Sequence, residues 1–212
     1  MLVYLIRHGQ SEANVKGVIQ GHQDFPLTEL GEQQASLVAD AMKDVSLDAI
    51  YASDLMRAYH TAREVENEQQ ASLSAWELIR EVGLGPLEGK TRAEMLDEYP
   101  DLHVRSLLTS GIDGTESIED ITFRCQNVLN ALLKQHKDDT VALVSHGGFI
   151  SIFLLYLIAG EQWHQLKRPF IIGNTGISKV EMNDEGFTSV HFVNRTDHLE
   201  RGTNLTSSTV VY

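Results

Sequence analysis

The sequence predicts an α/β fold, a three-layer α/β/α sandwich with a mostly parallel central sheet, in one domain over residues 1–212. Two observations support this prediction. Segments with the apolar pattern of strands alternate along the chain with segments of helical period, which is the order that produces a parallel sheet covered by helices on both faces. In addition, Val141–Val144 is an unbroken apolar run, as expected of a strand buried on both faces.

The first half of the chain is predicted to contain three strands and two helices. In order, they are a strand at Leu2–Ile6, a helix capped by Thr28 with apolar residues through Met42, a strand at Asp48–Ala52, a helix capped by Ser53, and a short strand at Leu73–Leu78. In the helix after Ser53, the spacing of the apolar residues places Arg57 in the first turns, near the end of the sheet. A charged side chain at that place is a candidate ligand-binding group.

The second half begins with the longest predicted helix. Ser117 and Asp120 form a capping pattern, and Ile121, Cys125, Val128, Leu129 and Leu132 follow at helical spacing. The strand Val141–Val144 comes next and leads through His146 and two glycines into another helix. Ile177–Met182 and Phe187–Val193 flank a polar turn and predict a hairpin. The polar tail after Leu199 is a candidate for disorder, although Val210–Tyr212 could dock on the domain.

Composition limits the function classes. The formal net charge is −13 and the basic residues are scattered, so we expect no nucleic-acid partner. The longest apolar stretch, Phe149–Ala159, contains Ser151 and is shorter than the ~20 residues of a membrane span, so we expect no membrane partner. The single cysteine, Cys125, lies at an apolar helical position and is predicted to be a buried thiol. The amino terminus has no recognisable export signal, which favours a cytoplasmic protein.

The end of the first strand carries the first chemical signal. Arg7 and His8 follow the apolar run directly, and ligands of open α/β sheets bind beyond the carboxyl ends of the strands. A guanidinium group suits phosphate, and an unprotonated imidazole is a nucleophile at neutral pH. The pair therefore indicates phosphoryl transfer, although an Arg-His pair alone is also common at structural strand ends.

Further motifs follow in a fixed order. They are Arg7-His8-Gly9-Gln10-Ser11, then Asn14 and Gln20-Gly21, then Ser53 to Ala62, then Arg80 to Gly89, and finally Ser145-His146-Gly147-Gly148. In this order they resemble the histidine phosphatase superfamily, also called the phosphoglycerate mutase-like family, and in character its broad-specificity phosphatase branch. The first motif is loose by itself, whereas the ordered set is specific and extends from Leu2 to about Gly148.

The resemblance implies roles for the residues that match. His8 would become a phosphohistidine, and nearby Arg charges would lower its pKa and keep the ring neutral. Arg7, Arg57 and His146 would bind the transferring phosphoryl group from several sides. Gly147 begins a helix, where free backbone N–H groups also attract an anion.

The family pattern also implies an acid and a phosphate-binding loop. Glu81 matches the carboxyl that protonates the leaving alkoxide and later takes a proton from water. Four more substrate-binding residues would lie in the loop after His8: Ser11, Asn14, Gln20 and Gly21. For Asn14 and Gln20, an ordinary surface loop is the alternative. Leu87 stands where relatives often carry Trp, a departure that affects the shape of the pocket, while Glu88 is expected to be structural.

The sequence therefore predicts a phosphomonoester hydrolase that acts through a phosphohistidine on a small phosphorylated metabolite and releases inorganic phosphate. It is expected to use no metal and no cofactor. A cofactor-dependent phosphoglycerate mutase is the first alternative, although such mutases carry a longer insertion between the acid and the second His. A non-catalytic module that binds phosphate esters is the second, disfavoured because no catalytic position is missing.

Some features are left open or carry weaker predictions. The segment Pro100–Gly114 is expected to form much of the cover over the pocket, and a homo-oligomer is possible. His22 and His198 could contact substrate, but exposure to solvent is the favoured interpretation of both. Phosphosugars, phosphoglycerates, phosphoserine and nucleotide-related monoesters all remain candidate substrates.

Overall fold

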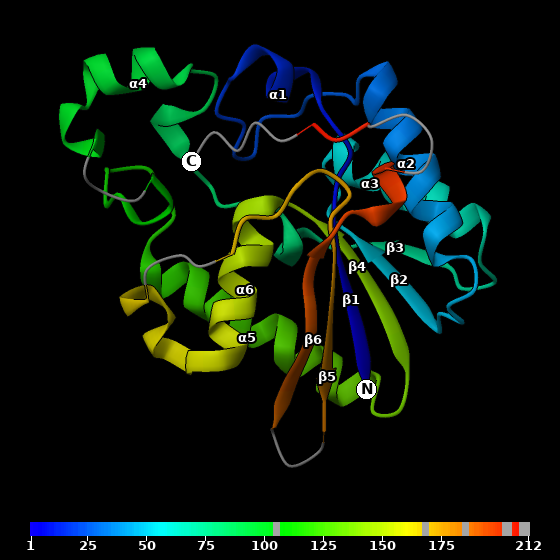
Figure 1. Ribbon diagram of the computed structural model, residues 1–212. Helices are drawn as coiled ribbons and strands as arrows, with labels where there is room; N and C mark the ends of the chain where they lie inside the picture. The colour runs from blue at the N-terminus through cyan, green and yellow to red at the C-terminus, as the bar shows by residue number, and fades with distance from the viewer. Residues whose placement is uncertain (104–106, 167–169, 184–186, 201–204, 208–212) are drawn as a thin grey trace.

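The structure is a computed structural model that describes residues 1–103, 107–166, 170–183, 187–200 and 205–207. Within these residues, one sheet has the strand order β3-β2-β4-β1-β5-β6 (Figure 1). The strands are β1 (Leu2–Arg7), β2 (Ala49–Ala52), β3 (Leu73–Ala75), β4 (Thr140–Ser145), β5 (Ile177–Met182) and β6 (Thr188–Arg195). β1 to β4 run parallel, and β5 and β6 form the predicted antiparallel hairpin at one edge. The predicted mostly parallel sheet is confirmed.

Helices cover both faces of this sheet. α2 (Glu29–Met42) and α3 (Met56–Asn67) pack on one face, and α5 (Ile118–Gln135) and α6 (Gly147–Ala159) pack on the other (Figure 1). Alternation along β1 shows the division, because Val3 and Leu5 belong to the core under α5 and α6, whereas Tyr4 and Ile6 belong to the core under α2 and α3. The three-layer prediction is therefore confirmed.

Shorter elements connect these layers. They are the helices α1 (Glu12–Lys16) and α4 (Arg92–Glu98) and the 3-10 segments Glu77–Ile79, Gly85–Leu87, Pro100–His103, Leu107–Thr109, Gly160–Gln165 and Asp197–Glu200. No helix of the described residues is long and apolar enough to cross a membrane. α6 is apolar all round because it lies within the protein core, where residues 147–156 are all buried.

The predicted helix starts were mostly right. Thr28 accepts a hydrogen bond from the Gly31 N–H and caps α2, and Ser117 forms a capping box with Asp120 at the start of α5. The predicted Ser53 cap was wrong, because α3 begins at Met56 after Leu55, without a side-chain cap. The hydroxyl of Ser53 instead lies 2.8 Å from Nε2 of His146. The same hydroxyl oxygen also accepts from the Leu55 N–H at 3.3 Å.

Sheet register brings the predicted site together. β4 lies between β1 and β2, with Arg7 opposite Ser145 and Ala52 opposite Val144. The residues that follow each parallel strand therefore meet at one edge of the sheet. These residues are His8, Ser53 and His146, from three segments far apart in the sequence.

Two predicted features lie partly outside the described residues. Within the expected cover over the pocket, residues 104–106 are not described. Leu102 and Leu107, on either side of them, are buried in the core beneath α5 and α6. In the tail, Val210–Tyr212 are not among the described residues. Leu205 and Ser207 are described, and both accept hydrogen bonds from the buried Gln34 amide of α2.

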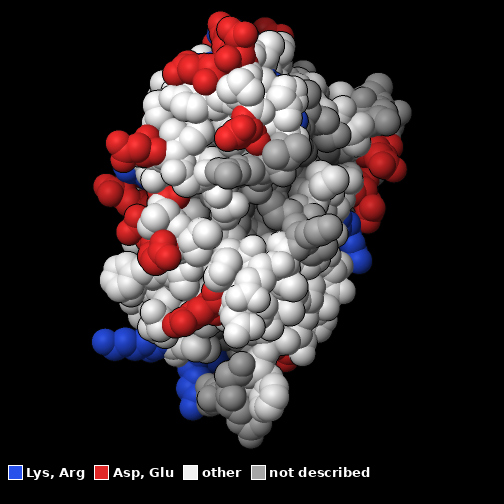
Figure 2. All heavy atoms as spheres, turned by 90° about the vertical axis from the view of Figure 1, so that its left-hand side faces the viewer, with Lys and Arg blue, Asp and Glu red and all other residues white. Residues whose placement is uncertain are grey.

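The acidic composition is visible on the surface. Figure 2 shows the side of the molecule that carries α4, where Asp and Glu side chains are spread over the face and Lys and Arg lie mainly near its edges. Among the described residues of this face no continuous basic patch forms. A polyanionic backbone would find little electrostatic attraction there.

Candidate active site

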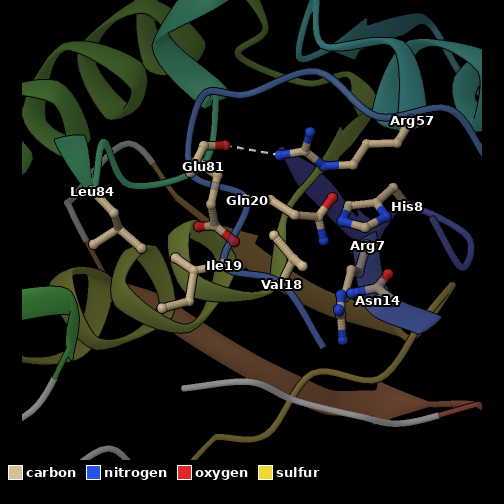
Figure 3. A pocket seen from close by; sticks show the side chains of 10 residues that line it. Arg7, His8, Asn14, Val18, Ile19, Gln20, Arg57, Glu81 and Leu84 are labelled. Atoms are coloured by element: carbon tan, nitrogen blue, oxygen red, sulfur yellow. Dashed lines mark hydrogen bonds between the residues drawn. The ribbon is translucent and has the colours of Figure 1, made fainter. Parts of the chain in front are cut away.

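One pocket lies at the carboxyl ends of the parallel strands. Its lining residues are Arg7, His8, Asn14, Val18, Ile19, Gln20, Gly21, Arg57, Glu81 and Leu84 (Figure 3). The predicted residues Arg7, His8, Arg57 and Glu81 are thus gathered from three separate parts of the chain. Of the predicted loop, Asn14, Gln20 and Gly21 line the pocket, whereas Ser11 does not line it. The predicted residues His146 and Gly147 are not among the lining residues either, and all three are buried.

His8 is held as a neutral ring with one nitrogen available. Its Nδ1–H donates to the Gly9 carbonyl oxygen at 2.6 Å, which leaves the lone pair on Nε2. Burial, followed by the charges of Arg57 and Arg7, places the pKa of His8 well below its ordinary value. The ring is therefore unprotonated at neutral pH, as a nitrogen nucleophile requires.

Two buried guanidinium groups supply positive charge beside His8. Arg7 donates from Nη1 to the Ile172 carbonyl oxygen at 2.7 Å. Arg57, which is 0% exposed, donates to the carbonyl oxygens of Gln23 and Gly21, both at 2.9 Å. These bonds fix the two planar groups before any ligand arrives, so little side-chain entropy remains to be lost on phosphate binding.

Ser11 orients the amides that face the pocket. The Ser11 backbone N–H donates to Oδ1 of Asn14 at 3.0 Å, and Nδ2 of Asn174 approaches the same oxygen at 3.3 Å. Because this oxygen is already used, the Asn14 side chain presents its NH₂ donor to the pocket. The Ser11 hydroxyl also lies 2.9 Å from Oε1 of Gln20. Ser11 is fully buried and acts on the pocket through its neighbours.

Gly21 is required by both backbone and space. Its φ of +48° lies in the left-handed region, and a Cβ placed there would come within 2.0 Å of Oε1 of Glu88. That carboxylate oxygen accepts hydrogen bonds from the His22 and Leu84 N–H groups, at 3.0 and 2.8 Å. Glu88 therefore joins the two loops that form the pocket walls, and its predicted structural role agrees with these contacts.

The carboxylate of Glu81 sits at the amino terminus of α6. Oε2 accepts a hydrogen bond from the Gly148 N–H at 3.1 Å, and Oε1 accepts from the Phe149 N–H at 2.8 Å and the Val82 N–H at 3.0 Å. Figure 3 shows this carboxylate between Leu84 and the polar side chains around His8. Glu81 thus has a fixed position at the boundary of the two halves of the pocket.

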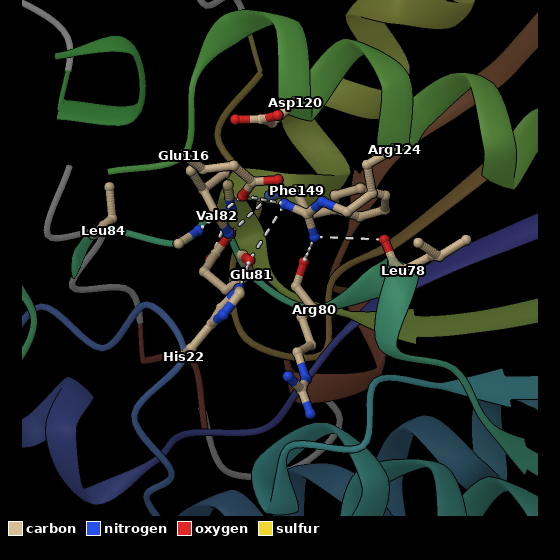
Figure 4. A network of polar contacts seen from close by, with 12 residues as sticks. His22, Leu78, Arg80, Glu81, Val82, Leu84, Glu116, Asp120, Arg124 and Phe149 are labelled. Carbon is tan, nitrogen blue, oxygen red and sulfur yellow. Dashed lines mark hydrogen bonds and ion pairs between the residues drawn. The ribbon is translucent and has the colours of Figure 1, made fainter. Parts of the chain in front are cut away.

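A second layer of contacts holds the backbone of the Glu81 segment (Figure 4). Arg124 donates to the Arg80 carbonyl oxygen at 2.6 Å and pairs with Glu116 at 2.7 Å. Glu116 in turn accepts from the Gly83 N–H at 2.9 Å. His22 donates from Nε2 to the Glu81 carbonyl oxygen at 2.8 Å, so this side chain has a defined partner at the pocket wall.

His146 lies beside His8. Its ring centroid is 5.2 Å from that of His8, at an interplanar angle of 60°. Burial, then Arg57 and His8, places the pKa of His146 well below its ordinary value. With both imidazoles neutral, the positive charge of this end of the pocket comes from Arg7 and Arg57, which matches the dianionic charge of a phosphate monoester.

Comparison with known proteins decides the family. Residues 3–195 match the family model described as "Histidine phosphatase superfamily (branch 1)". The chain belongs to this superfamily. The predicted family, fold and enzyme class are therefore confirmed.

Relatives of this histidine phosphatase include both phosphatases and mutases. The chain is 32% identical over 199 residues to "Putative phosphoserine phosphatase 2" of Hydrogenobacter thermophilus, covering 92% of this chain and 96% of that protein. It is 36% identical over 186 residues to "Probable phosphoglycerate mutase GpmB" of Enterobacter sp., covering 86% and 85%.

Solved structures show the same fold. A mycobacterial glucosyl-3-phosphoglycerate phosphatase matches with a TM-score of 0.82 and 25% identity, over 92% of this chain and 99% of that chain. Phosphoserine phosphatase from Entamoeba histolytica, in complex with 3-phosphoglyceric acid, matches with a TM-score of 0.76 and 32% identity, over 93% and 98%.

Several residues of this histidine phosphatase were not predicted from its sequence. Thr61 accepts from the Gly9 N–H at 3.0 Å and donates to the Arg57 carbonyl oxygen at 2.7 Å, so it links the loop after His8 to α3. Its position four residues after Arg57 is a signal that sequence reasoning could have used. Asn174 donates to the His8 carbonyl oxygen at 3.1 Å, but its distance along the chain gave no signal.

One histidine was interpreted wrongly. His198 was expected to face solvent, but it is 4% exposed and shares a 3.0 Å hydrogen bond with the Thr175 hydroxyl. The Thr175 N–H donates to the His8 carbonyl oxygen at 3.3 Å, so His198 supports the segment that bonds to the His8 backbone. Among the described residues, no three His, Cys, Asp or Glu side chains are grouped closely enough to hold a metal ion.

Proposed function

We propose that the protein hydrolyses monoesters of small phosphorylated metabolites through a phosphohistidine on His8. The observation that carries this proposal is a neutral, buried His8 with Nε2 available, set between two fixed guanidinium groups and across the pocket from Glu81. Arg7, Arg57, Asn14 and Gln20 are assigned to the phosphoryl oxygens. Backbone donors at Gly21 and Gly147 are assigned to the same group.

The reaction follows from these positions in two steps. Nε2 of His8 attacks phosphorus, and the bond between phosphorus and the ester oxygen breaks as its electron pair moves to that oxygen. Glu81 gives this oxygen a proton, so an alcohol leaves. A water molecule then attacks phosphorus, Glu81 takes a proton from it, and cleavage of the P–N bond returns neutral His8 and inorganic phosphate.

The two halves of the pocket suggest how a substrate lies. Arg7, Arg57 and the amides occupy one side, while Ile19 and Leu84 form an apolar wall on the other (Figure 3). The phosphoryl group fits the first half and the carbon skeleton of the alcohol fits the second. Glu81 between them is suitably placed to protonate the bridging oxygen. We therefore expect good turnover of esters whose alcohol has an apolar portion next to the phosphate.

A phosphoglycerate mutase remains the second candidate, because the family relative from Enterobacter carries that name. It would use the same residues but return the phosphoryl group to an acceptor hydroxyl instead of water. The short stretch between Glu81 and His146 favours hydrolysis. The third candidate, a module that binds esters without turnover, is disfavoured because nucleophile, acid and cations lie in one pocket.

A substrate panel with excess chelator distinguishes the three. We expect steady release of inorganic phosphate from at least one of 3-phosphoglycerate, phosphoserine, phosphosugars and an aryl phosphate, with kcat/KM measured for each. Isomerisation of 3-phosphoglycerate without phosphate release would favour the mutase, and binding without turnover would favour the binding module. A requirement for added divalent metal would contradict the proposed site.

Trapping the intermediate tests the mechanism itself. Quenching during turnover without acid should yield an acid-labile, base-stable phosphate on the peptide that contains His8. His8→Ala should abolish both the label and turnover, while His164→Ala, at an exposed histidine after α6, should keep both. More than trace activity in His8→Ala would refute a phosphohistidine at this position.

A further inference from the structure

The imidazole of His146, next to His8, has one hydrogen-bonded nitrogen and one nitrogen without a partner among the described residues. Nε2 of His146 lies 2.8 Å from the Ser53 hydroxyl oxygen. Nδ1 is buried and makes no hydrogen bond to any residue that the structure describes. Because the whole side chain is 0% exposed, solvent does not compensate for the missing partner. A buried polar atom of this kind needs a partner, and a bound ligand can supply it.

Ser53 is fixed by the sheet. Its backbone N–H donates to the Val144 carbonyl oxygen at 2.9 Å, one step beyond the pairing of Ala52 with Val144. The Ser53 hydroxyl oxygen accepts from the Leu55 N–H at 3.3 Å. The hydroxyl proton is then free to point at Nε2 of His146, which satisfies both functions of the hydroxyl group.

The opposite proton arrangement leaves groups unsatisfied. If Nε2 carried the proton, it would donate to Ser53, and Nδ1 would keep a buried lone pair. A lone pair on Nδ1 would repel the phosphoryl oxygens, which are stabilised by hydrogen-bond donors. The hydroxyl proton of Ser53 would also need a new acceptor, because the Leu55 N–H and the imidazole would both be donating to its oxygen.

We propose that Ser53 is a positioning residue that keeps the proton of neutral His146 on Nδ1, so that this nitrogen donates a hydrogen bond to the phosphoryl group. His146 then contributes a directed donor without a charge. The proton stays on the imidazole throughout, and Ser53 itself does not contact substrate. This inference rests on the proposed phosphatase site and assigns a function to a serine to which the sequence analysis gave no role besides that of a helix cap.

Nuclear magnetic resonance of the full chain tests the proton position directly. The protein is labelled with ¹⁵N-histidine and saturated with inorganic phosphate or orthovanadate, and the His146 signals are assigned by their loss in His146→Gln. We expect a protonated Nδ1 and an unprotonated Nε2. A proton on Nε2 would overturn the proposal. Because this measurement needs no turnover, it still decides the tautomer if the panel shows no hydrolysis and the proposed function fails.

Three serine variants supply the kinetic test. Ser53→Ala should populate the other tautomer, lower kcat/KM by about 10- to 100-fold and weaken inhibition by phosphate. Ser53→Thr retains a hydroxyl and should recover most of the loss. Ser151→Ala is the matched control, since it removes a buried hydroxyl of α6 that bonds to the Phe170 carbonyl oxygen, away from the pocket.

The contrary results are equally clear. An unchanged tautomer in Ser53→Ala, with kcat/KM within about twofold of the parent, would refute the positioning role. A similar loss in Ser151→Ala would show that any buried hydroxyl of this region has the same effect, and would also refute it. Thermal unfolding of each variant checks that all are folded at the assay temperature.

Discussion

Replacing Glu81 by Gln perturbs the proposed acid and its anchor at α6 together. Both carboxylate oxygens accept backbone N–H groups, from Val82 and Phe149 at Oε1 and from Gly148 at Oε2. Gln has a single acceptor oxygen, so its NH₂ must turn toward an N–H donor or leave the helix end. Loss of one such buried hydrogen bond should lower the free energy of unfolding by about 1–3 kcal/mol.

The catalytic effect of Glu81→Gln depends on the ester. An alkyl phosphate has a poor leaving group, and removal of the transferable proton should slow its phosphorylation of His8 by ~10²–10⁴-fold. An aryl phosphate needs little protonation of its leaving group, so this step should be much less affected. Hydrolysis of the phosphoenzyme should become limiting, because the same carboxyl is proposed to activate water.

Rapid mixing with alkyl and aryl esters measures the phosphorylation step before steady state. A distorted pocket would slow both esters alike, so the ratio of the two rates isolates the role of the proton. Glu94→Gln is the control, because Glu94 also accepts an N–H at the start of a helix, at Thr91 before α4, and lies outside the pocket. If Glu81→Gln slowed both esters equally, its role as leaving-group acid would be refuted.

The remaining predictions concern charge and burial. Arg57→Ala should slow phosphorylation by both ester types about equally, by ~10²–10³-fold, in the same rapid-mixing assay; selective loss with alkyl esters would contradict its role. Because the folded pKa of His8 lies below the unfolded value of ~6.5, the unfolded chain binds this proton first as pH falls. His8 therefore does not reduce the free energy of unfolding above pH ~6.5, but below this pH it reduces it by up to about 1.4 kcal/mol per pH unit. In urea unfolding, the free energy of His8→Gln should fall less steeply with decreasing pH than that of the parent protein. Burial raises the pKa of Cys125 to about 12, so a disulfide reagent should react with it only after unfolding; rapid native reaction would refute this.

Local patterns predicted much of the fold. Thr28 and Ser117 each cap a helix through an N–H three residues ahead, a contact that sequence spacing contains. Arg57 reached the pocket because the period of α3 and the strand before it fix where its first turn lies. Arg7 and His8 were singled out because few residue types suit phosphoryl transfer, and Glu81 because it matches the family pattern; the structure places all three in one pocket.

Predictions failed where a distant segment competed with the local one. Ser53 has the correct residue type for a cap, but α3 begins only at Met56, and the Ser53 hydroxyl also bonds to His146 at the end of β4. His198 is polar and lies near the end of the chain, yet Thr175 and the surrounding residues bury it.

The sequence by itself determined which groups this histidine phosphatase contains and which helices and strands carry them, because periodicity and capping act over a few neighbouring residues. Only the tertiary structure decided the states of those groups. The neutral form of His8 results from burial and from two arginines, Arg7 at the end of β1 and Arg57 in α3. The NH₂ of Asn14 faces the pocket because Ser11 and Asn174 donate to its oxygen. Desolvation and electrostatic interactions sum over all neighbours in space, and these neighbours are fixed by folding.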